Sequence, residues 1–233
     1  MLLIPVVDLM RGRAVRAVRG NRETYQPVVS MLCAGSDPLG VARALCRHCA
    51  AAQLYVADLD ALTGGAAQVQ VLREMLDAMP ETELWLDAGF ADAAAADALC
   101  AAIGASAQRI VPVFGSESLR SRAALVACFA APRRGILSLD RRDGQRLDAA
   151  GCWDLPQHWP HQVIVMTLER VGADSGPDLD TLRATAARAP GVKLIGAGGV
   201  RNPADMEQAR AAGAHAWLVA SALHDGRLPA VRR

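Results

Sequence analysis

Residues 192–200 read Val-Lys-Leu-Ile-Gly-Ala-Gly-Gly-Val, a short apolar run that ends in a pair of glycines. Similar runs recur along the chain, and most lack polar–apolar alternation, which is typical of strands buried on both faces of a parallel sheet. The sequence therefore predicts eight strands: Leu2–Val7, Gln53–Asp58, Glu83–Leu86, Arg109–Val113, Gly135–Leu139, Gln162–Met166, Val192–Ile195 and Ala216–Val219.

Longer segments rich in alanine, leucine and arginine separate these strands and carry a helical pattern. The predicted helices are Pro38–Ala52, Gln68–Met79, Ala91–Ile103, Ser118–Ala130, Leu179–Ala189 and Pro203–Ala212. Residues 141–160 lack the pattern and are predicted as a loop. Eight evenly spaced strand–helix units predict an α/β fold, a (β/α)8 TIM barrel formed by residues 1–233 as a single domain. A doubly wound sheet is the alternative.

Composition and charge exclude several classes of protein. The chain is 52% hydrophobic and 21% charged, which excludes disorder, and its net charge of +1 leaves no basic surplus for nucleic acid. No apolar run reaches the roughly 18 residues of a membrane span. The N-terminal run ends at Asp8 without a basic segment, so we expect a cytoplasmic protein with reduced cysteines. Cys46 and Cys49 lie within a helical pattern, and no second cysteine pair follows them.

The chain also contains an internal repeat. Four pairs of segments resemble each other and occur in the same order in both halves: 6–8 with 138–140, 56–60 with 165–169, 84–92 with 194–202, and 114–119 with 219–223. We predict two similar half-barrels, approximately residues 1–130 and 131–233, related by two-fold symmetry. Every pair falls at the carboxyl end of a predicted strand, which is the face that carries chemistry in this fold.

Asp8 and Asp140 end the first and fifth predicted strands. These strands lie opposite each other in an eight-stranded barrel, so the two carboxylates would face each other across its mouth. One would act as a base and the other as an acid if their surroundings separate their pKa values. The alternative for each residue is a bond to its own loop or a helix cap.

Glycines and serines at the ends of other predicted strands indicate phosphate sites. Gly198 and Gly199 follow the seventh strand and Ser221 follows the eighth, the recurrent phosphate position of this barrel class. The alternative is a tight turn. The equivalent places in the first half hold Gly89, Gly115 and Ser116, which predict a second phosphate site. Asp87 beside that site would repel an anion.

Two loops add further candidates. Arg16 lies with Arg19 and Arg22 in the loop after the first predicted strand, where they would either close over an anionic substrate or remain solvated. Trp153, in the loop after the fifth strand, would either stack on a heterocycle or pack against the barrel. The five histidines show no metal-ligand spacing, so no metal is predicted.

Together these segments resemble the phosphoribosylformimino-AICAR-phosphate (ProFAR) isomerase family of histidine biosynthesis. The resemblance spans almost the whole chain and rests on Ile4–Arg16 with Gly20, Val56–Gly65, Ser138–Gly144, Thr167, Ser175–Leu179, Ala197–Val200 and Val219–Gly226. It implies an Amadori rearrangement of an aminoaldose to an aminoketose, with no cofactor and no metal. It also implies Asp8 as the base that moves the C2 proton, Asp140 as the acid that assists ring opening, and Thr167 beside a substrate with two phosphates.

Three loops depart from the family's pattern. Asp87–Ala91 replaces a Gly-Gly-Gly-Ile-Arg loop, and Ala220 replaces a glycine. Glu169–Asp174 stands where the family has an Arg-Asp-Gly-Thr turn, and the segment there is one residue shorter than in the family. We therefore expect an intact acid–base pair and an altered second phosphate site.

Three functions stay open. They are the histidine-pathway isomerase, a diverged paralogue acting on another phosphorylated substrate, for example in methanopterin-type cofactor biosynthesis, and a non-catalytic barrel that binds a phosphorylated ligand. In each case the expected partner is a phosphorylated small molecule, without nucleic acid or membrane, and the expected assembly is a monomer or small homo-oligomer.

Overall fold

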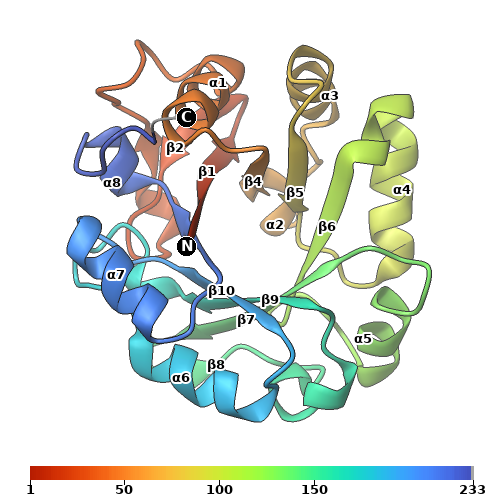
Figure 1. Ribbon diagram of the computed structural model, residues 1–233. Coiled ribbons are helices and arrows are strands. Elements are labelled where there is room, and N and C mark those ends of the chain that lie inside the picture. The colour runs from red at the N-terminus through yellow and green to blue at the C-terminus, as the bar shows by residue number, and fades with distance from the viewer. Residues whose placement is uncertain (232–233) are drawn as a thin grey trace.

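The computed structural model describes residues 1–231, and its central element is a closed ring of eight parallel strands (Figure 1). In their order around the ring these are β1 (Leu2–Met10), β4 (Gln53–Asp58), β5 (Glu83–Asp87), β6 (Ile110–Gly115), β7 (Ile136–Arg142), β9 (Gln162–Thr167), β10 (Lys193–Ala197) and β11 (Ala216–Val219). Pairing of β11 with β1, Leu2 opposite Ala216, closes the ring. The predicted TIM barrel is confirmed, and the doubly wound alternative is wrong because an open sheet leaves its edges unpaired.

The helices surround this ring (Figure 1). The longer ones are α1 (Pro38–Cys49), α3 (Val69–Ala78), α4 (Ala93–Ile103), α5 (Arg122–Cys128), α6 (Leu179–Arg188) and α7 (Pro203–Ala211). The short helices are α2 (Leu59–Leu62), α8 (Ser221–His224), η1 (Arg22–Thr24), η2 (Ala105–Arg109), η3 (Cys152–Asp154), η4 (Pro156–His158) and η5 (Leu168–Arg170). Only η3 and η4 lie in residues 141–160, the stretch without a helical pattern.

Capping side chains decide where several helices begin. Asp92 accepts a hydrogen bond from the backbone N–H of Ala95, and Ser121 accepts one from that of Ala124. A capping residue stays outside the helix, so α4 and α5 begin after Asp92 and Ser121, later than the apolar pattern predicts.

Two apolar layers hold the barrel together. Along β4, Tyr55 and Ala57 face the inside of the ring, whereas Leu54 and Val56 pack beneath the helices. Because successive side chains of a strand point to opposite faces, both faces must be apolar when both are covered. This explains why the strands read as continuous apolar runs.

A tight hairpin follows the first strand of each half. β1 turns at Arg11 and Gly12 into β2 (Arg13–Arg16), and β7 turns at Asp143 and Gly144 into β8 (Gln145–Arg146). All four turn residues have positive φ angles, as a type I′ hairpin turn requires. A third short strand, β3 (Gln26–Pro27), pairs with β2. No helix within residues 1–231 is long and apolar enough to cross a membrane.

Candidate active site

A cavity of about 980 Å³, its open mouth included, lies at the carboxyl ends of the barrel strands. Every strand of the ring, or the loop that follows it, contributes to its wall. The polar side chains of the wall are Asp8, Arg22, Tyr25, Tyr55, Asp87, Glu117, Asp140, Arg170, Asp174 and Ser221. This cavity therefore collects residues from both halves of the chain.

The cavity brings the two predicted acids together from opposite sides of the ring. Asp8 lies on β1 and Asp140 on β7, and four steps separate these strands in either direction around the ring. Strand register then sets their neighbours, because Asp8 lies opposite Ala57, which in turn lies opposite Asp87 on β5. Asp8 and Asp87 consequently occupy one level of the barrel.

Asp8 is a half-buried carboxylate without a protein partner. It lines the cavity, and no hydrogen bond from residues 1–231 reaches its oxygens. Burial raises its pKa to about 7, an effect that the guanidinium of Arg22 partly offsets. A carboxyl group with this pKa can both accept and release a proton near neutral pH, which suits a general base.

Asp140 is held by its own strand and by the loop after β6. Its Oδ1 accepts a 2.6 Å hydrogen bond from the Ser138 hydroxyl, and its Oδ2 accepts one of 3.2 Å from the backbone N–H of Glu117. Burial and the neighbouring Glu117 carboxylate raise the pKa of Asp140 well above its ordinary value. A raised pKa favours the protonated carboxyl group, and a protonated carboxyl group suits a general acid.

Two further carboxylates line the cavity near these acids. Asp87 is buried, and it accepts hydrogen bonds from the Tyr55 hydroxyl at 2.9 Å and from the backbone N–H of Gly89 at 3.2 Å. Burial raises its pKa to about 6. Glu117, which follows β6, accepts a 2.7 Å hydrogen bond from Arg22. This region is the carboxylate end of the cavity.

Sequence reasoning missed Glu117, Tyr25 and Tyr55 as parts of this wall. Glu117 directly follows the predicted phosphate residues Gly115 and Ser116, so its charge was a signal available at that position. Tyr55 lies within an apolar strand, and nothing in the sequence alone shows that its side chain points into the barrel.

The opposite wall is the glycine end, which contains Gly198, Gly199 and Ser221 together with Gly172. Gly198 and Gly199 have φ angles of 81° and 82°, which favour glycine. A Cβ on Gly199 would also overlap the carbonyl oxygen of Gly176. The glycine pair is thus required for packing of the β9–α6 loop as well as for exposing backbone to the cavity.

Several residues predicted for the site lie behind the cavity wall instead of on it. Ser116 is fully buried, and its hydroxyl accepts a 2.8 Å hydrogen bond from the backbone N–H of Asp140. Thr167 donates a 2.9 Å hydrogen bond to Asp178. Since Met166 points into the barrel, strand alternation turns Thr167 away from it. Gly89 and Gly115 likewise do not line the cavity.

Arg16 and Trp153 are held by other contacts. Arg16 forms a bidentate ion pair with Asp225, at 2.6 and 2.8 Å. Trp153 is buried, donates a 3.3 Å hydrogen bond to the Asp140 carbonyl, and lies beneath Arg146, whose guanidinium is 5.2 Å from the ring centroid.

The buried thiols of α1 have no partners for metal binding. Burial raises the pKa of Cys46 to about 12 and that of Cys49 to about 11, so both are protonated thiols at neutral pH. Within residues 1–231 no group of three or more His, Cys, Asp or Glu side chains is arranged to hold a metal ion.

The chain is similar in sequence to known proteins over almost its whole length. Residues 2–229 match the family model described as histidine biosynthesis protein. The chain is 26% identical over 235 residues to an uncharacterized protein of Methanocaldococcus jannaschii, covering 98% of this chain and 95% of that protein.

Two further relatives carry the name 1-(5-phosphoribosyl)-5-((5-phosphoribosylamino)methylideneamino) imidazole-4-carboxamide isomerase. The protein of Thermomicrobium roseum is 28% identical over 245 residues, covering 98% of this chain and 94% of the relative. The protein of Xylella fastidiosa strain M12 is 29% identical over 253 residues, covering 97% and 87%.

Proposed function

Because this chain belongs to the histidine biosynthesis protein family, we propose that it is an isomerase that converts a phosphorylated aminoaldose into the corresponding aminoketose. In this proposal Asp8 is the general base and Asp140 the general acid, and the loops that carry Gly198, Gly199 and Ser221 bind a phosphate of the substrate.

One observation carries the proposal: two carboxyl groups on opposite strands line one cavity in different surroundings. The pKa of Asp8 is about 7, whereas that of Asp140 lies well above its ordinary value. Arg22 lowers the pKa of Asp8, whereas the Glu117 carboxylate raises that of Asp140, so their surroundings act in opposite directions. A base and an acid that act at the same pH need such opposite surroundings. Names of the relatives from Thermomicrobium roseum and Xylella fastidiosa support an isomerase.

The chemistry needs only proton transfers. Asp140 donates its proton to the ring oxygen as the bond from that oxygen to C1 breaks, which leaves an iminium between C1 and the amine nitrogen. Asp8 then removes the C2 proton to form an enaminol and returns that proton to C1, which yields the aminoketose. No atom is gained or lost over the cycle, since the proton returned to Asp140 comes from the C2 hydroxyl.

A second candidate function is isomerisation of a different phosphorylated substrate. Asp87 and Glu117 favour it, because they line the cavity beside the predicted second phosphate position of Gly115 and Ser116. Carboxylates there oppose the binding of a second phosphate. A non-catalytic barrel that binds phosphorylated ligands is the third possibility. Such a barrel would not need different surroundings for Asp8 and Asp140.

The test is turnover of the histidine-pathway aminoaldose bisphosphate by the purified chain. If the chain turns this bisphosphate over, we expect kcat to fall by roughly 10²–10⁴-fold in Asp8→Asn and in Asp140→Asn. Glu81→Gln is the matched control, because Glu81 is an exposed carboxylate before β5, at the other end of the barrel. Turnover that survives in both aspartate variants contradicts the acid–base proposal. No turnover of the bisphosphate favours the second candidate.

A further inference from the structure

The two ends of the cavity differ in charge. The wall near the glycine end includes Asp174, which is already paired with Arg227 at 2.5 Å. At the carboxylate end Asp8, Asp87, Glu117 and Asp140 all line the wall. One substrate bound across this cavity therefore meets two different electrostatic environments.

We propose that the substrate carries one phosphate, bound at the glycine end, and an amino group at its other end, bound among the carboxylates. This inference rests on the proposed function, because it assumes that the cavity is the active site. It replaces a second phosphate with a group of opposite charge.

Arg22 is the one cationic side chain of the described residues that lines the carboxylate end, and it is already paired. Its Nη2 lies 2.7 Å from Oε1 of Glu117, and both side chains are three-quarters buried or more. A second phosphate would have to displace Glu117 from Arg22 and then lie beside it. The pair thus makes this end unsuitable for an anion.

Asp8 supplies an independent argument for a donor group. Its carboxylate lines the cavity, and no hydrogen bond from residues 1–231 reaches it. Its oxygens are therefore free to accept hydrogen bonds from a bound substrate, and a phosphate dianion has no donor to offer them. An ammonium group brings three N–H donors and a positive charge, which would satisfy Asp8 and its acidic neighbours together.

Tyr55 and Gly89 do not meet this need for donors. The Tyr55 hydroxyl donates to Asp87 at 2.9 Å and the Gly89 N–H at 3.2 Å, so both are committed to one carboxylate. Asp140 is served by Ser138 and the Glu117 backbone. Among these four carboxyl groups, Asp8 and one oxygen of Glu117 thus accept no hydrogen bond from residues 1–231, and both groups line the cavity.

Calorimetric titration of the full chain at pH 7 with three commercial sugar phosphates tests the proposal. The probes are glucosamine 6-phosphate, glucose 6-phosphate and glucose 1,6-bisphosphate. They share the 6-phosphate and differ at the other end of the sugar, which carries an ammonium at C2, only hydroxyls, or a second phosphate at C1. We expect the dissociation constant to rise in that order, by about tenfold or more between the first probe and the last.

Glu117→Gln is expected to bind glucose 1,6-bisphosphate more tightly than the unaltered chain does. A misfolded variant would not show such an increase in affinity. Loss of the Glu117 charge frees Arg22, so affinity for glucose 1,6-bisphosphate should rise about tenfold while the preference for the amine falls. Asp87→Asn should reduce the ratio of the dissociation constant for glucose 1,6-bisphosphate to that for glucosamine 6-phosphate. Glu81→Gln, the exposed carboxylate at the other end of the barrel, should leave all three dissociation constants unchanged.

Each outcome decides the inference. Bisphosphate binding as tight as that of glucosamine 6-phosphate overturns it, and so does a neutral sugar phosphate that binds more tightly than the amine. Failure of the proposed function is distinguishable, because it is read from turnover and its loss in Asp8→Asn. The expected binding order without turnover supports the inference alone, whereas bisphosphate turnover with the reverse order overturns the inference alone.

Discussion

Asp8 and Asp140 are the same residue type at equivalent strand ends, yet their neighbours differ. Asp140 accepts hydrogen bonds from Ser138 and from the backbone of Glu117, whereas Asp8 accepts none from residues 1–231. Burial raises both pKa values; Arg22 partly offsets the rise at Asp8, whereas the Glu117 carboxylate adds to the rise at Asp140. Surroundings, not residue type, therefore separate the proposed base from the proposed acid.

The raised pKa of Asp8 has a consequence for stability. Its pKa is about 7 in the folded chain and has its ordinary value of 3.8 in the unfolded chain, so the folded state binds more protons between these values. Stability from this group therefore falls as pH rises from about 4 to 7. We expect Asp8→Asn to raise the free energy of unfolding by ~2 kcal/mol at pH 8 and to leave it unchanged at pH 4.

Urea unfolding followed by circular dichroism at the two pH values measures this effect. Glu81→Gln, an exposed carboxylate, should show no difference between them. Equal effects of Asp8→Asn at pH 4 and pH 8 would show that the charge of Asp8 is not destabilising.

Gly199 and Gly64 form a matched pair for testing the glycine loop. Their φ angles are 82° and 85°, but only a Cβ on Gly199 would overlap neighbouring backbone, that of Gly176 and Pro177. Gly64→Ala should cost about 1 kcal/mol of stability from backbone strain alone. Gly199→Ala must also displace the β9–α6 loop, so we expect about 3 kcal/mol or more and weaker phosphate binding.

Thermal or urea unfolding of both variants, with titration of inorganic phosphate, measures the difference. Equal destabilisation by the two substitutions would mean that the β9–α6 loop can move to accommodate the new methyl group without loss of stability.

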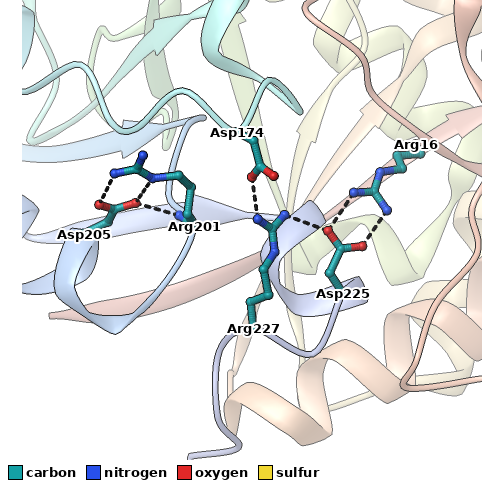
Figure 2. A network of polar contacts seen from close by, with 6 residues as sticks. All are labelled: Arg16, Asp174, Arg201, Asp205, Asp225 and Arg227. Carbon is teal, nitrogen blue, oxygen red and sulfur yellow. Dashed lines mark hydrogen bonds and ion pairs between the residues drawn. The ribbon is translucent and has the colours of Figure 1, made fainter.

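At the scale of elements, ion pairs tie together three segments that are remote in sequence (Figure 2). Arg16 on β2 pairs with Asp225, the residue after α8, and Asp225 also accepts a 2.6 Å hydrogen bond from Arg227. Arg227 reaches Asp174 in the β9–α6 loop. A Cβ on Gly172 of that loop would overlap the Ala17 carbonyl, so the loop and the segment after β2 touch directly. These contacts hold both segments over the glycine end of the cavity.

Asp225→Asn tests this network. Arg16 lowers the pKa of Asp225, so its contribution is present above about pH 4 and is lost as pH falls through its folded value. We expect a loss of about 1 kcal/mol at pH 7, smaller at high salt, with faster amide hydrogen exchange in residues 13–24.

Glu207→Gln is its control, because the Glu207–Arg210 pair is exposed. It should change stability by less than about 0.5 kcal/mol. Unchanged hydrogen exchange in Asp225→Asn would mean that backbone contacts, such as that between Arg19 and Val171, hold the loops without the ion pairs.

At the scale of the whole molecule, the two halves share a hairpin after the first strand and an acid at its end. Cutting the chain between residues 130 and 131 would separate β6 from β7. Each of the two fragments would then carry four strands of the ring. Either fragment alone would expose two unpaired sheet edges and the apolar barrel interior. We expect each fragment alone to aggregate, and the co-expressed fragments to assemble into a species of about 24.6 kDa.

Co-purification through a tag on one fragment, followed by size-exclusion chromatography, measures this assembly. A monomeric and folded single fragment would show that half of the ring is stable by itself, and would contradict the need for closure.

The eight strands of the ring and the six longer helices follow from local sequence patterns. Each strand of the ring is a local apolar run, and five of the six longer helices begin at a capping side chain, α3 being the exception. The placement of Asp8, Asp140 and Gly198 at strand ends follows from those boundaries. The order and even spacing of the elements then predict the barrel, because short connections leave few ways to cover both faces of the strands.

Which of the candidate residues reach the cavity depends on the folded chain and cannot be predicted from local patterns. Thr167 and Met166 differ by one position, and strand alternation turns only Met166 inward. Glu117 meets Arg22, and Arg16 meets Asp225, across 95 and 209 residues of chain. Such pairs depend on ring closure and on side-chain direction, and neither is encoded in a local pattern. The charge of the cavity, and with it the kind of substrate, therefore depends on contacts between residues that lie far apart in the sequence.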